Sequence, residues 1–517
     1  MTWEPELDEI RRREELARRM GGEDNIKRQH DSGRFTVRER IEKLLDAGTF
    51  HERGSLSGRA TYDGVELTEF RPANFVMGHG RIDGRPVVVG GDDFTVRGGA
   101  GDAGMIIKQI QAERMAREWR MPMIRLVDGT GGGGSVRMLD QMKRTYLPGM
   151  PGWDESTAAM SEIPIVGAAL GPVAGLGAVR AVAAHFSVMV KGLSQVFVAG
   201  PPVVARALPE SPDKEELGGS HIHTRNGTID NEAESEDDAL DQVRRFLSYL
   251  PSSVWEGPPR GPVADDPERR DEELLSIIPR ERRRVYDARR LVRHVVDDGS
   301  VFEIGRWWGR SIVTCFARLD GWPVGIMAGD PGYIGGSLTA DTAEKMVRFI
   351  DLCDTFRVPV VHLLDQPGFL IGTAGEKAST IRKGVRLMAA VNQADVPWVT
   401  VITRKAFGVA GASHGPEGRL NSRFAWPSAD WGSLPLEGGI EAAYRRELEA
   451  ADDPEAFLAD ITARMNAIRS PLRSAEAFNI EEMIDPRDTR PILCGWAERA
   501  HHLVAQDLRP RARGLRP

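Results

Sequence analysis

Cysteine is scarce and long hydrophobic runs are missing, and these absences exclude several classes of protein. The three cysteines, Cys315, Cys353 and Cys494, stand far apart, so the sequence supports neither a disulfide framework nor a CxxC zinc motif. No stretch approaches the roughly 18 consecutive apolar residues of a membrane-spanning helix. The charged N-terminus, MTWEPELDEIRRREELARRM, lacks the apolar segment of a signal peptide. We therefore expect a cytoplasmic protein with no membrane span.

A net positive charge and the common catalytic motifs are also absent. The 517 residues carry a formal net charge of −8, whereas general nucleic-acid binders present a net basic surface. The sequence has no GxxxxGK[ST] phosphate loop and no HExxH metal motif. His221 and His223 form a pair without a third ligand in view. We expect no nucleic-acid partner and no metal site.

The most informative feature that is present is an internal repeat. The sequence DGRPV at 83–87 matches DGWPV at 320–324, an offset of 237, and the same offset pairs Asp128 with Asp365. In each copy, short apolar runs alternate with helical segments, as in strands that are covered on both faces. These runs are 87–89, 124–127, 324–327 and 360–364. The pattern predicts an α/β fold of two tandem domains related by internal duplication.

An acidic and proline-rich stretch, residues 206–275, separates the two copies and reads as a helix followed by a linker. We place the boundary near Pro259, which gives an N-terminal domain over 1–259 and a C-terminal domain over 260–517. The first 45 residues read as a charged helical arm, and we prefer a segment that packs on a neighbouring subunit over a solvated surface helix.

Each copy also contains a strand that leads through a glycine-rich turn into a helix. The turn Gly175-Leu176-Gly177 aligns with Gly408-Val409-Ala410. Small residues at such a turn let the backbone present N–H groups to a negative charge or a polarised carbonyl oxygen. Two turns predict two oxyanion holes, each worth about 3 kcal/mol for one donor. The alternative is that these glycines only allow the helix to pack closely on the strand.

Two other glycine-rich segments occupy matching positions after the strands. Gly98-Gly99 aligns with Gly335-Gly336, and the run Gly131–Ser135 takes the place that Pro367–Gly372 takes in the second copy. We therefore read Gly131–Ser135 as a native loop and not as a flexible linker. Because the chain offers backbone amides and no evident side-chain nucleophile, chemistry through a stabilised enolate is favoured over covalent catalysis.

Longer segments follow in a fixed order and spacing, and they carry a family resemblance. They are RQHDSGRFTVRERIEKLLDAGTF, GDDFTVRGGA, EELGGSHIHTRNG, GGSLTADTAEKMVRFIDLCDTFRVPVVHLLDQPGFLIG, ITRKAFGVAGA and WGSLPLEGGIEAAYRREL. Along nearly its whole length the chain resembles the carboxyltransferase subunits of biotin-dependent acyl-CoA carboxylases, such as the propionyl-CoA carboxylase beta chain. The resemblance implies two crotonase-like domains of the ClpP/crotonase superfamily per chain. It also implies a hexamer, a trimer of dimers, in which the N-domain of one subunit faces the C-domain of another.

The resemblance further implies transfer of CO2 from carboxybiotin to the α-carbon of an acyl-CoA. Gly175, Leu176 and Gly177 would hold the thioester carbonyl on the acyl-CoA side, and Val409 and Ala410 would hold the ureido oxygen on the biotin side. No side chain is then needed as general base. Further ligand contacts are expected at the following residues: Gly98, Gly99, Gly368, Phe369, Gly408, Gly411 and Ala412.

The implied partners follow from what the chain lacks. Because the sequence has no ATP-grasp pattern and no Met-Lys-Met biotinylation motif, a separate biotin carboxylase and a biotin carrier subunit are implied. Leu176 and Val409 stand where common members have glycine, and Ala412 stands where they have an acidic residue that sorts acyl groups. Preference for acetyl-CoA or propionyl-CoA is therefore not carried over, and a larger or branched acyl group is a hypothesis. Two alternatives stay open: a biotin-dependent decarboxylase subunit acting on a malonyl-type CoA thioester, or a non-catalytic scaffold.

Overall fold

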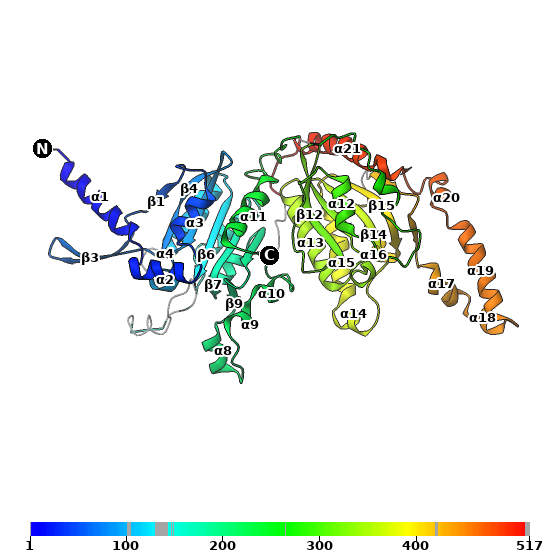
Figure 1. Ribbon diagram of the computed structural model, residues 1–517, viewed down its shortest axis with the longest axis horizontal. Coiled ribbons are helices and arrows are strands. Elements are labelled where there is room, and N and C mark those ends of the chain that lie inside the picture. The colour runs from blue at the N-terminus through cyan, green and yellow to red at the C-terminus, as the bar shows by residue number, and fades with distance from the viewer. Residues whose placement is uncertain are drawn as a thin grey trace. The chain divides into compact units, whose positions relative to one another are not determined.

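The computed structural model describes residues 2–100, 105–129, 143–145, 147, 149–263, 265–418 and 422–511. The run Gly131–Ser135, which we read as a native loop, lies outside the described residues. The chain splits into two compact units (Figure 1). Unit 1 comprises Met1–Glu256 with Arg509–Pro517, and unit 2 comprises Gly257–Leu508.

Unit 1 is built on an eight-stranded sheet in the order β1-β4-β5-β6-β7-β8-β10, with β9 paired to β7. Neighbouring strands from β5 onward are parallel, whereas β1, β4 and β5 pair antiparallel. The strands are β1 (His51–Arg53), β4 (Phe75–Ile82), β5 (Arg85–Asp92), β6 (Met123–Gly129), β7 (Ile165–Ala174), β8 (Phe186–Val190), β9 (Gln195–Phe197) and β10 (Asn231–Ala233). Every residue of β6 is buried, as expected for a parallel strand covered on both faces.

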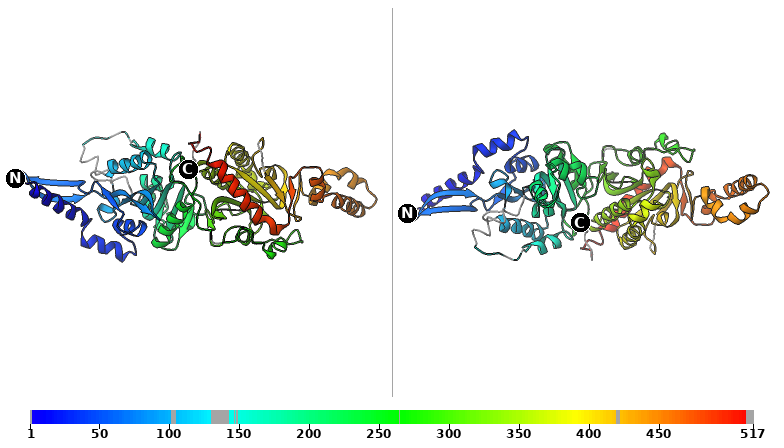
Figure 2. Two further views of the ribbon diagram at one scale, coloured as in Figure 1. Left: turned by 90° about the horizontal axis from the view of Figure 1, so that it is seen from above. Right: turned by 90° about the horizontal axis from the view of Figure 1, so that it is seen from below.

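Helices cover both faces of this sheet, and a short hairpin and the N-terminal helix extend from it. The helices of unit 1 are α1 (Glu4–Arg18), α2 (Glu23–Asp31), α3 (Val37–Leu44), α4 (Met105–Glu118), α6 (Trp153–Ala159), α7 (Leu176–Val182), α8 (Pro201–Ala207), α9 (Lys214–Gly218), α10 (Ser220–His223), α11 (Glu236–Ser248) and the 3-10 turn η1 (Arg97–Gly99). A capping box of Thr36 and Glu39 begins α3. The hairpin of β2 (Gly58–Asp63) and β3 (Glu66–Pro72) lies alongside α1 (Figure 2), where Arg13 Nη1 donates to Tyr62 Oη at 2.9 Å.

Unit 2 repeats this architecture with a second eight-stranded sheet, in the order β11-β12-β13-β14-β15-β16-β18 with β17 paired to β15. Its strands are β11 (Phe302–Glu303), β12 (Ile312–Leu319), β13 (Trp322–Gly329), β14 (Val360–Gln366), β15 (Trp398–Phe407), β16 (Ser422–Ala425), β17 (Asp430–Gly432) and β18 (Glu482–Met483). Its core joins helices α12 (Ala288–Val295) and α21 (Thr489–Val504) to the sheet through side chains such as Leu291, Val361 and Leu493.

The helices of unit 2 include one group that extends away from the sheet, α17 to α19 (Figure 1). The helical elements are η2 (Glu272–Leu275), α12 (Ala288–Val295), η3 (Ile334–Gly336), α13 (Ala340–Thr355), α14 (Thr373–Lys377), α15 (Thr380–Gln393), α16 (Gly408–Ala412), α17 (Leu436–Ala443), α18 (Arg445–Ala450), α19 (Pro454–Ile468), α20 (Pro471–Glu476), η4 (Pro486–Asp488) and α21 (Thr489–Val504).

The two units repeat each other in detail, so the prediction of two tandem α/β domains related by duplication is confirmed. The hairpin β4–β5 corresponds to β12–β13, and both turns carry an aspartate with positive φ, +48° at Asp83 and +50° at Asp320. The repeat also includes α3 and α12, where residue 37 aligns with residue 288 at an offset of 251. There the ion pair Arg38–Glu52 recurs as Arg289–Glu303.

Candidate functional site

The first predicted turn lies where β7 ends and α7 begins. Gly175 has φ +56°, which favours glycine, and its N–H donates to Phe197 O at 3.3 Å. Leu176 and Gly177 are the first two residues of α7. Within the described ranges their N–H groups donate to no acceptor, as is usual for the first turn of a helix. Two backbone donors are thus available at this turn.

The backbone of η1 lies directly on the end of β6, next to this turn. A Cβ on Gly99 would fall 2.4 Å from Asp128 O, and one on Gly129 would fall 2.8 Å from Gly98 O, so side chains are excluded at both positions. Gly129 is in turn the register partner of Val173, two residues before Gly175. The structure therefore brings the predicted residues Gly98 and Gly99 to the same sheet edge as Gly175, Leu176 and Gly177.

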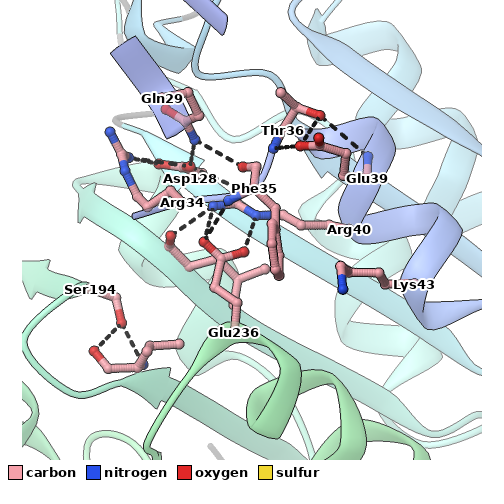
Figure 3. A network of polar contacts seen from close by, with 12 residues as sticks. Gln29, Arg34, Phe35, Thr36, Glu39, Arg40, Lys43, Asp128, Ser194 and Glu236 are labelled. Carbon is pink, nitrogen blue, oxygen red and sulfur yellow. Dashed lines mark hydrogen bonds and ion pairs between the residues drawn. The ribbon is translucent and has the colours of Figure 1, made fainter. Parts of the chain in front are cut away.

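A buried network of charged side chains surrounds Asp128, next to these strand ends (Figure 3). Asp128, at the end of β6, accepts hydrogen bonds from Arg40 Nη1 at 2.8 Å, Arg34 Nη1 at 3.0 Å and Gln29 Nε2 at 3.2 Å. Arg40 also forms a forked pair with Glu236, at 2.7 Å and 2.9 Å, and donates to Leu170 O in β7 at 2.9 Å. Charge-assisted, bidentate hydrogen bonds of this kind are stronger than hydrogen bonds between neutral groups. They tie α3, β6, β7 and α11 together.

Burial and ion pairing shift the pKa values of these charged side chains in opposite directions. Burial lowers the pKa of Arg40, but the carboxylates of Asp128 and Glu236 more than offset this and raise the pKa above its usual value. Burial raises the pKa of Asp92 at the end of β5, against the lowering effect of Arg180 at 3.1 Å. Asp92 also accepts from Asp128 N at 3.2 Å. Because Arg180 belongs to α7, Asp92 links the helix of the turn to the strand ends.

The second predicted turn lies where β15 ends and α16 begins. Gly408 has φ +61°, and the side chain of Val409 is 56% exposed, so it does not fill the interior behind the turn. Ala410 is buried, and a Cβ on Gly411 would fall 2.6 Å from the carbonyl carbon of Ala406. Within the described ranges, the N–H groups of Gly408, Val409 and Ala410 have no recorded acceptor. This turn resembles the first in offering backbone donors.

Three neutral side chains donate hydrogen bonds to the segment that follows this second turn. The carbonyl oxygen of His414, just after α16, accepts from His362 Nδ1 at 3.1 Å, Trp398 Nε1 at 2.9 Å and Thr400 Oγ1 at 2.8 Å. Burial lowers the pKa of His362 to about 4, so this ring is neutral at ordinary pH. The two turns therefore share a backbone shape but differ in how they are supported.

The loop after β14 lies at the neighbouring strand end. Gly368 has φ +128°, its carbonyl oxygen accepts from Leu338 N at 2.9 Å, and Phe369 bridges to Leu338 just beyond η3. A Cβ on Gly384 of α15 would fall 2.4 Å from Phe369 Cε1, so the ring rests on that glycine. The register pairs Gln366 with Ala406, which brings this loop beside the turn at Gly408.

The structure thus gathers the predicted site residues into two groups, one in each unit. The first group holds Gly98, Gly99, Gly175, Leu176 and Gly177, and the second holds Gly368, Phe369, Gly408, Val409, Ala410, Gly411 and Ala412. Our interpretation of the sequence did not identify the network of Arg34, Arg40, Asp128 and Glu236. The alignment of Asp128 with Asp365 was a signal for the aspartate, but nothing in the sequence links it to Glu236.

Among the described residues, no group of three or more His, Cys, Asp or Glu side chains is placed to hold a metal ion. Across the same residues, no helix is both long enough and apolar enough to cross a membrane.

Comparison with known proteins gives consistent matches along the chain. Residues 28–511 match a family model described as the carboxyl transferase domain. A propionyl-CoA carboxylase carboxyltransferase subunit from Haloferax mediterranei is 37% identical over 500 residues, which cover 95% of each chain. A methylmalonyl-CoA decarboxylase subunit alpha from Veillonella parvula is 33% identical and covers 91% of each. The crystal structure of a transcarboxylase 12S hexamer, with methylmalonyl-coenzyme A and methylmalonic acid bound, is 30% identical, with a TM-score of 0.88 over 100% of this chain and 98% of that one.

Proposed function

Because the chain belongs to the carboxyl transferase family, and is a biotin-dependent acyl-CoA carboxyltransferase with two crotonase-like domains, we propose that its two turns divide the reaction between them. The turn of unit 1 receives the thioester carbonyl of the acyl-CoA. The turn of unit 2 receives the ureido oxygen of biotin. The observation that supports this division is the recurrence, in both units, of a glycine with positive φ followed by backbone N–H groups without acceptors among the described residues.

The residues of each turn fit the group proposed for it. In unit 1, the N–H groups of Leu176 and Gly177 can stabilise the negative charge that develops on the thioester oxygen as the enolate forms. In unit 2, the N–H groups of Val409 and Ala410 lie in a turn whose Gly408 and Gly411 leave no side chain in the way. When bound, carboxybiotin supplies the CO2 and then a ureido nitrogen that takes the α-proton. This chain then contributes orientation and backbone donors, and no side chain acts as general base.

The assembly and the partners are part of the same proposal. The transcarboxylase 12S structure is named as a hexamer, and we propose that this chain also forms a hexamer, a trimer of dimers in which residues 1–259 on the acyl-CoA side meet residues 260–517 of another copy on the biotin side. We further propose a separate biotin carboxylase and biotin carrier subunit as partners, and a location in the cytoplasm. The names of the relatives favour this carboxylase subunit over the decarboxylase and scaffold alternatives.

Proline at Leu176 tests the assignment of the first turn. Leu176 is the first residue of α7, where proline is well tolerated but removes the N–H donor. We expect Leu176→Pro to lower the rate of carboxyl exchange between free biotin and a malonyl-type thioester by about 10²–10³-fold. The matched variant Leu176→Ala keeps the donor and should lose less than about tenfold, while changing which acyl group is preferred.

Equal exchange rates for the proline and alanine variants would show that the Leu176 N–H is not a donor in the reaction. Absence of exchange in the unmodified protein, over a series of straight and branched acyl groups, would refute the transferase proposal as a whole.

A further inference from the structure

The short strand β9 holds one side of the acyl-side turn. It lies off the main path of the sheet and pairs in parallel with the end of β7. Its last carbonyl, Phe197 O, accepts the Gly175 N–H at 3.3 Å. That bond takes Gly175 out of the set of free donors and leaves the N–H groups of Leu176 and Gly177 for a ligand. The position of β9 therefore fixes the start of the helix that carries these two donors.

A histidine supports the outer edge of β9, beside α9 and α10 (Figure 1). The strand has three residues, so it makes few ladder hydrogen bonds, and an edge strand leaves its outer carbonyls unpaired. His223, the last residue of α10, places its Nε2 2.7 Å from Val196 O. A carbonyl oxygen only accepts, so Nε2 carries a proton and donates it. α9 packs on the same edge, where a Cβ on Gly218 would fall 2.4 Å from Val196 O.

The other nitrogen of His223 agrees with a neutral ring. Nδ1 is buried and has no hydrogen-bond partner among the described residues, so a proton there would bury a charge without an acceptor. Burial lowers the pKa of His223, the Val196 carbonyl acts in the opposite direction, and the neighbouring His221 lowers the pKa further. The ring is therefore a neutral donor to the strand.

Unit 2 anchors the corresponding strand by different chemistry. β17 pairs with the end of β15 as β9 pairs with the end of β7. Asp430 of β17 accepts from Arg282 Nη1 at 2.9 Å, and Trp431 Nε1 donates to Ser474 Oγ at 3.2 Å. Both units thus hold the short strand beside the turn, with a histidine in unit 1 and with an ion pair and an indole in unit 2.

We propose that His223 is a positioning residue of the acyl-side turn: by holding the outer edge of β9, it keeps the N–H groups of Leu176 and Gly177 directed at the thioester oxygen. This inference rests on the function proposed above for that turn. In this role the imidazole acts through β9 and takes no proton from the substrate. Because the negative charge on the thioester oxygen grows only as the enolate forms, a displaced turn costs more in the transition state than in the bound substrate. The effect should therefore appear in kcat and not in KM for the thioester.

The first experiment compares three replacements of His223 in carboxyl exchange between free biotin and a malonyl-type thioester. His223→Phe keeps a flat ring without a donor, so kcat should fall by about 10–100-fold while KM for the thioester changes by less than about threefold. His223→Gln carries its amide nitrogen at about the place of Nε2 and should restore most of the rate. His223→Asn carries its amide nitrogen closer to the backbone, at about the place of Nδ1, and should not.

The matched control is His221→Gln, on the same helix. The side chain of His221 is 52% exposed, and its Nδ1 lies 3.8 Å from Glu215 Oε1 and not at β9. This variant should keep kcat within about twofold. Gly218→Ala disturbs the outer edge of β9 by a different route, because the added Cβ would meet Val196 O. It should lower kcat with KM for the thioester unchanged, as His223→Phe does.

Deuterium uptake read by mass spectrometry tests the anchoring of β9 without turnover. In full-length His223→Phe, uptake should accelerate in β9 and in the turn 175–177 and stay unchanged in β4, β5 and unit 2. Acceleration throughout unit 1 would show a general structural role and would overturn the proposal.

The kinetic outcomes decide independently. An unchanged kcat in His223→Phe, a change confined to KM, or equal rates for His223→Gln and His223→Asn would each overturn the proposal, while normal carboxyl exchange by the unmodified protein left the proposed function intact. If His223→Phe does not fold, the comparison of the glutamine and asparagine variants decides.

Discussion

Replacing Arg40 with leucine should strongly destabilise unit 1. Leucine is the residue that the second copy carries at the equivalent position, Leu291, so the fold accepts its shape there. Arg40 is 1% exposed and makes four hydrogen bonds, two to Glu236, one to Asp128 and one to Leu170 O. The substitution removes all four hydrogen bonds and leaves two buried carboxylates with fewer donors.

The expected loss of stability depends on the hydrogen-bond donors that each carboxylate keeps in Arg40→Leu. Asp128 retains Arg34 and Gln29, but Glu236 retains only the Phe35 N–H at 3.2 Å among its recorded contacts. Removing one partner of a buried ion pair costs about 3–5 kcal/mol, because the remaining charge stays buried and uncompensated. We therefore expect a loss of about 3–5 kcal/mol in the free energy of opening for unit 1.

Hydrogen exchange read by mass spectrometry is the appropriate assay, because a chain of two units need not unfold in one transition. Exchange should accelerate in α3, β6 and α11 and remain unchanged in unit 2. A control is Arg445→Leu, which removes an exposed helix pair with Glu449 and should cost less than about 0.5 kcal/mol. Adding Glu236→Gln to Arg40→Leu should recover part of the loss. A cost below about 1 kcal/mol for Arg40→Leu would refute the reasoning.

Two further predictions concern single positions. Gly171→Ala would place a Cβ 2.1 Å from Asp128 Oδ1, so we expect a cost of about 1–3 kcal/mol by thermal unfolding and slower carboxyl exchange, whereas Gly257→Ala, which meets nothing within 4 Å, should be neutral. Burial lowers the pKa of Lys345 to about 7, so the unfolded chain binds more protons than the folded one above that pH. The stability of unit 2 should then rise between about pH 7 and pH 10, by at most about 1.4 kcal/mol per pH unit, and Lys345→Met should abolish this rise in urea unfolding. A slope that survives in Lys345→Met would assign it to another group.

The sequence predicted the parts of this structure that depend on local pattern and on repetition. Apolar runs such as 124–127 are the centres of buried parallel strands, and the glycine turns at 175 and 408 do join a strand to a helix. Pairings between residues far apart in the chain could not be predicted. Glu236 reaches Arg40 across 196 residues, and only the fold brings them together. The contact between Asp365 and Tyr286 could not be predicted for the same reason.

Gly171 and Arg404 occupy the same position of the duplicated strand, and each fits only its own half. An arginine at 171 would compete with Arg34 for Asp128, and a glycine at 404 would take away the cation nearest to Asp365. The aspartate, its helix and this strand position must therefore change together if the halves are to become alike again. A chimeric chain that combined the strand of one copy with the helix of the other would bring together residues that do not pair, so segments of the two units are not interchangeable.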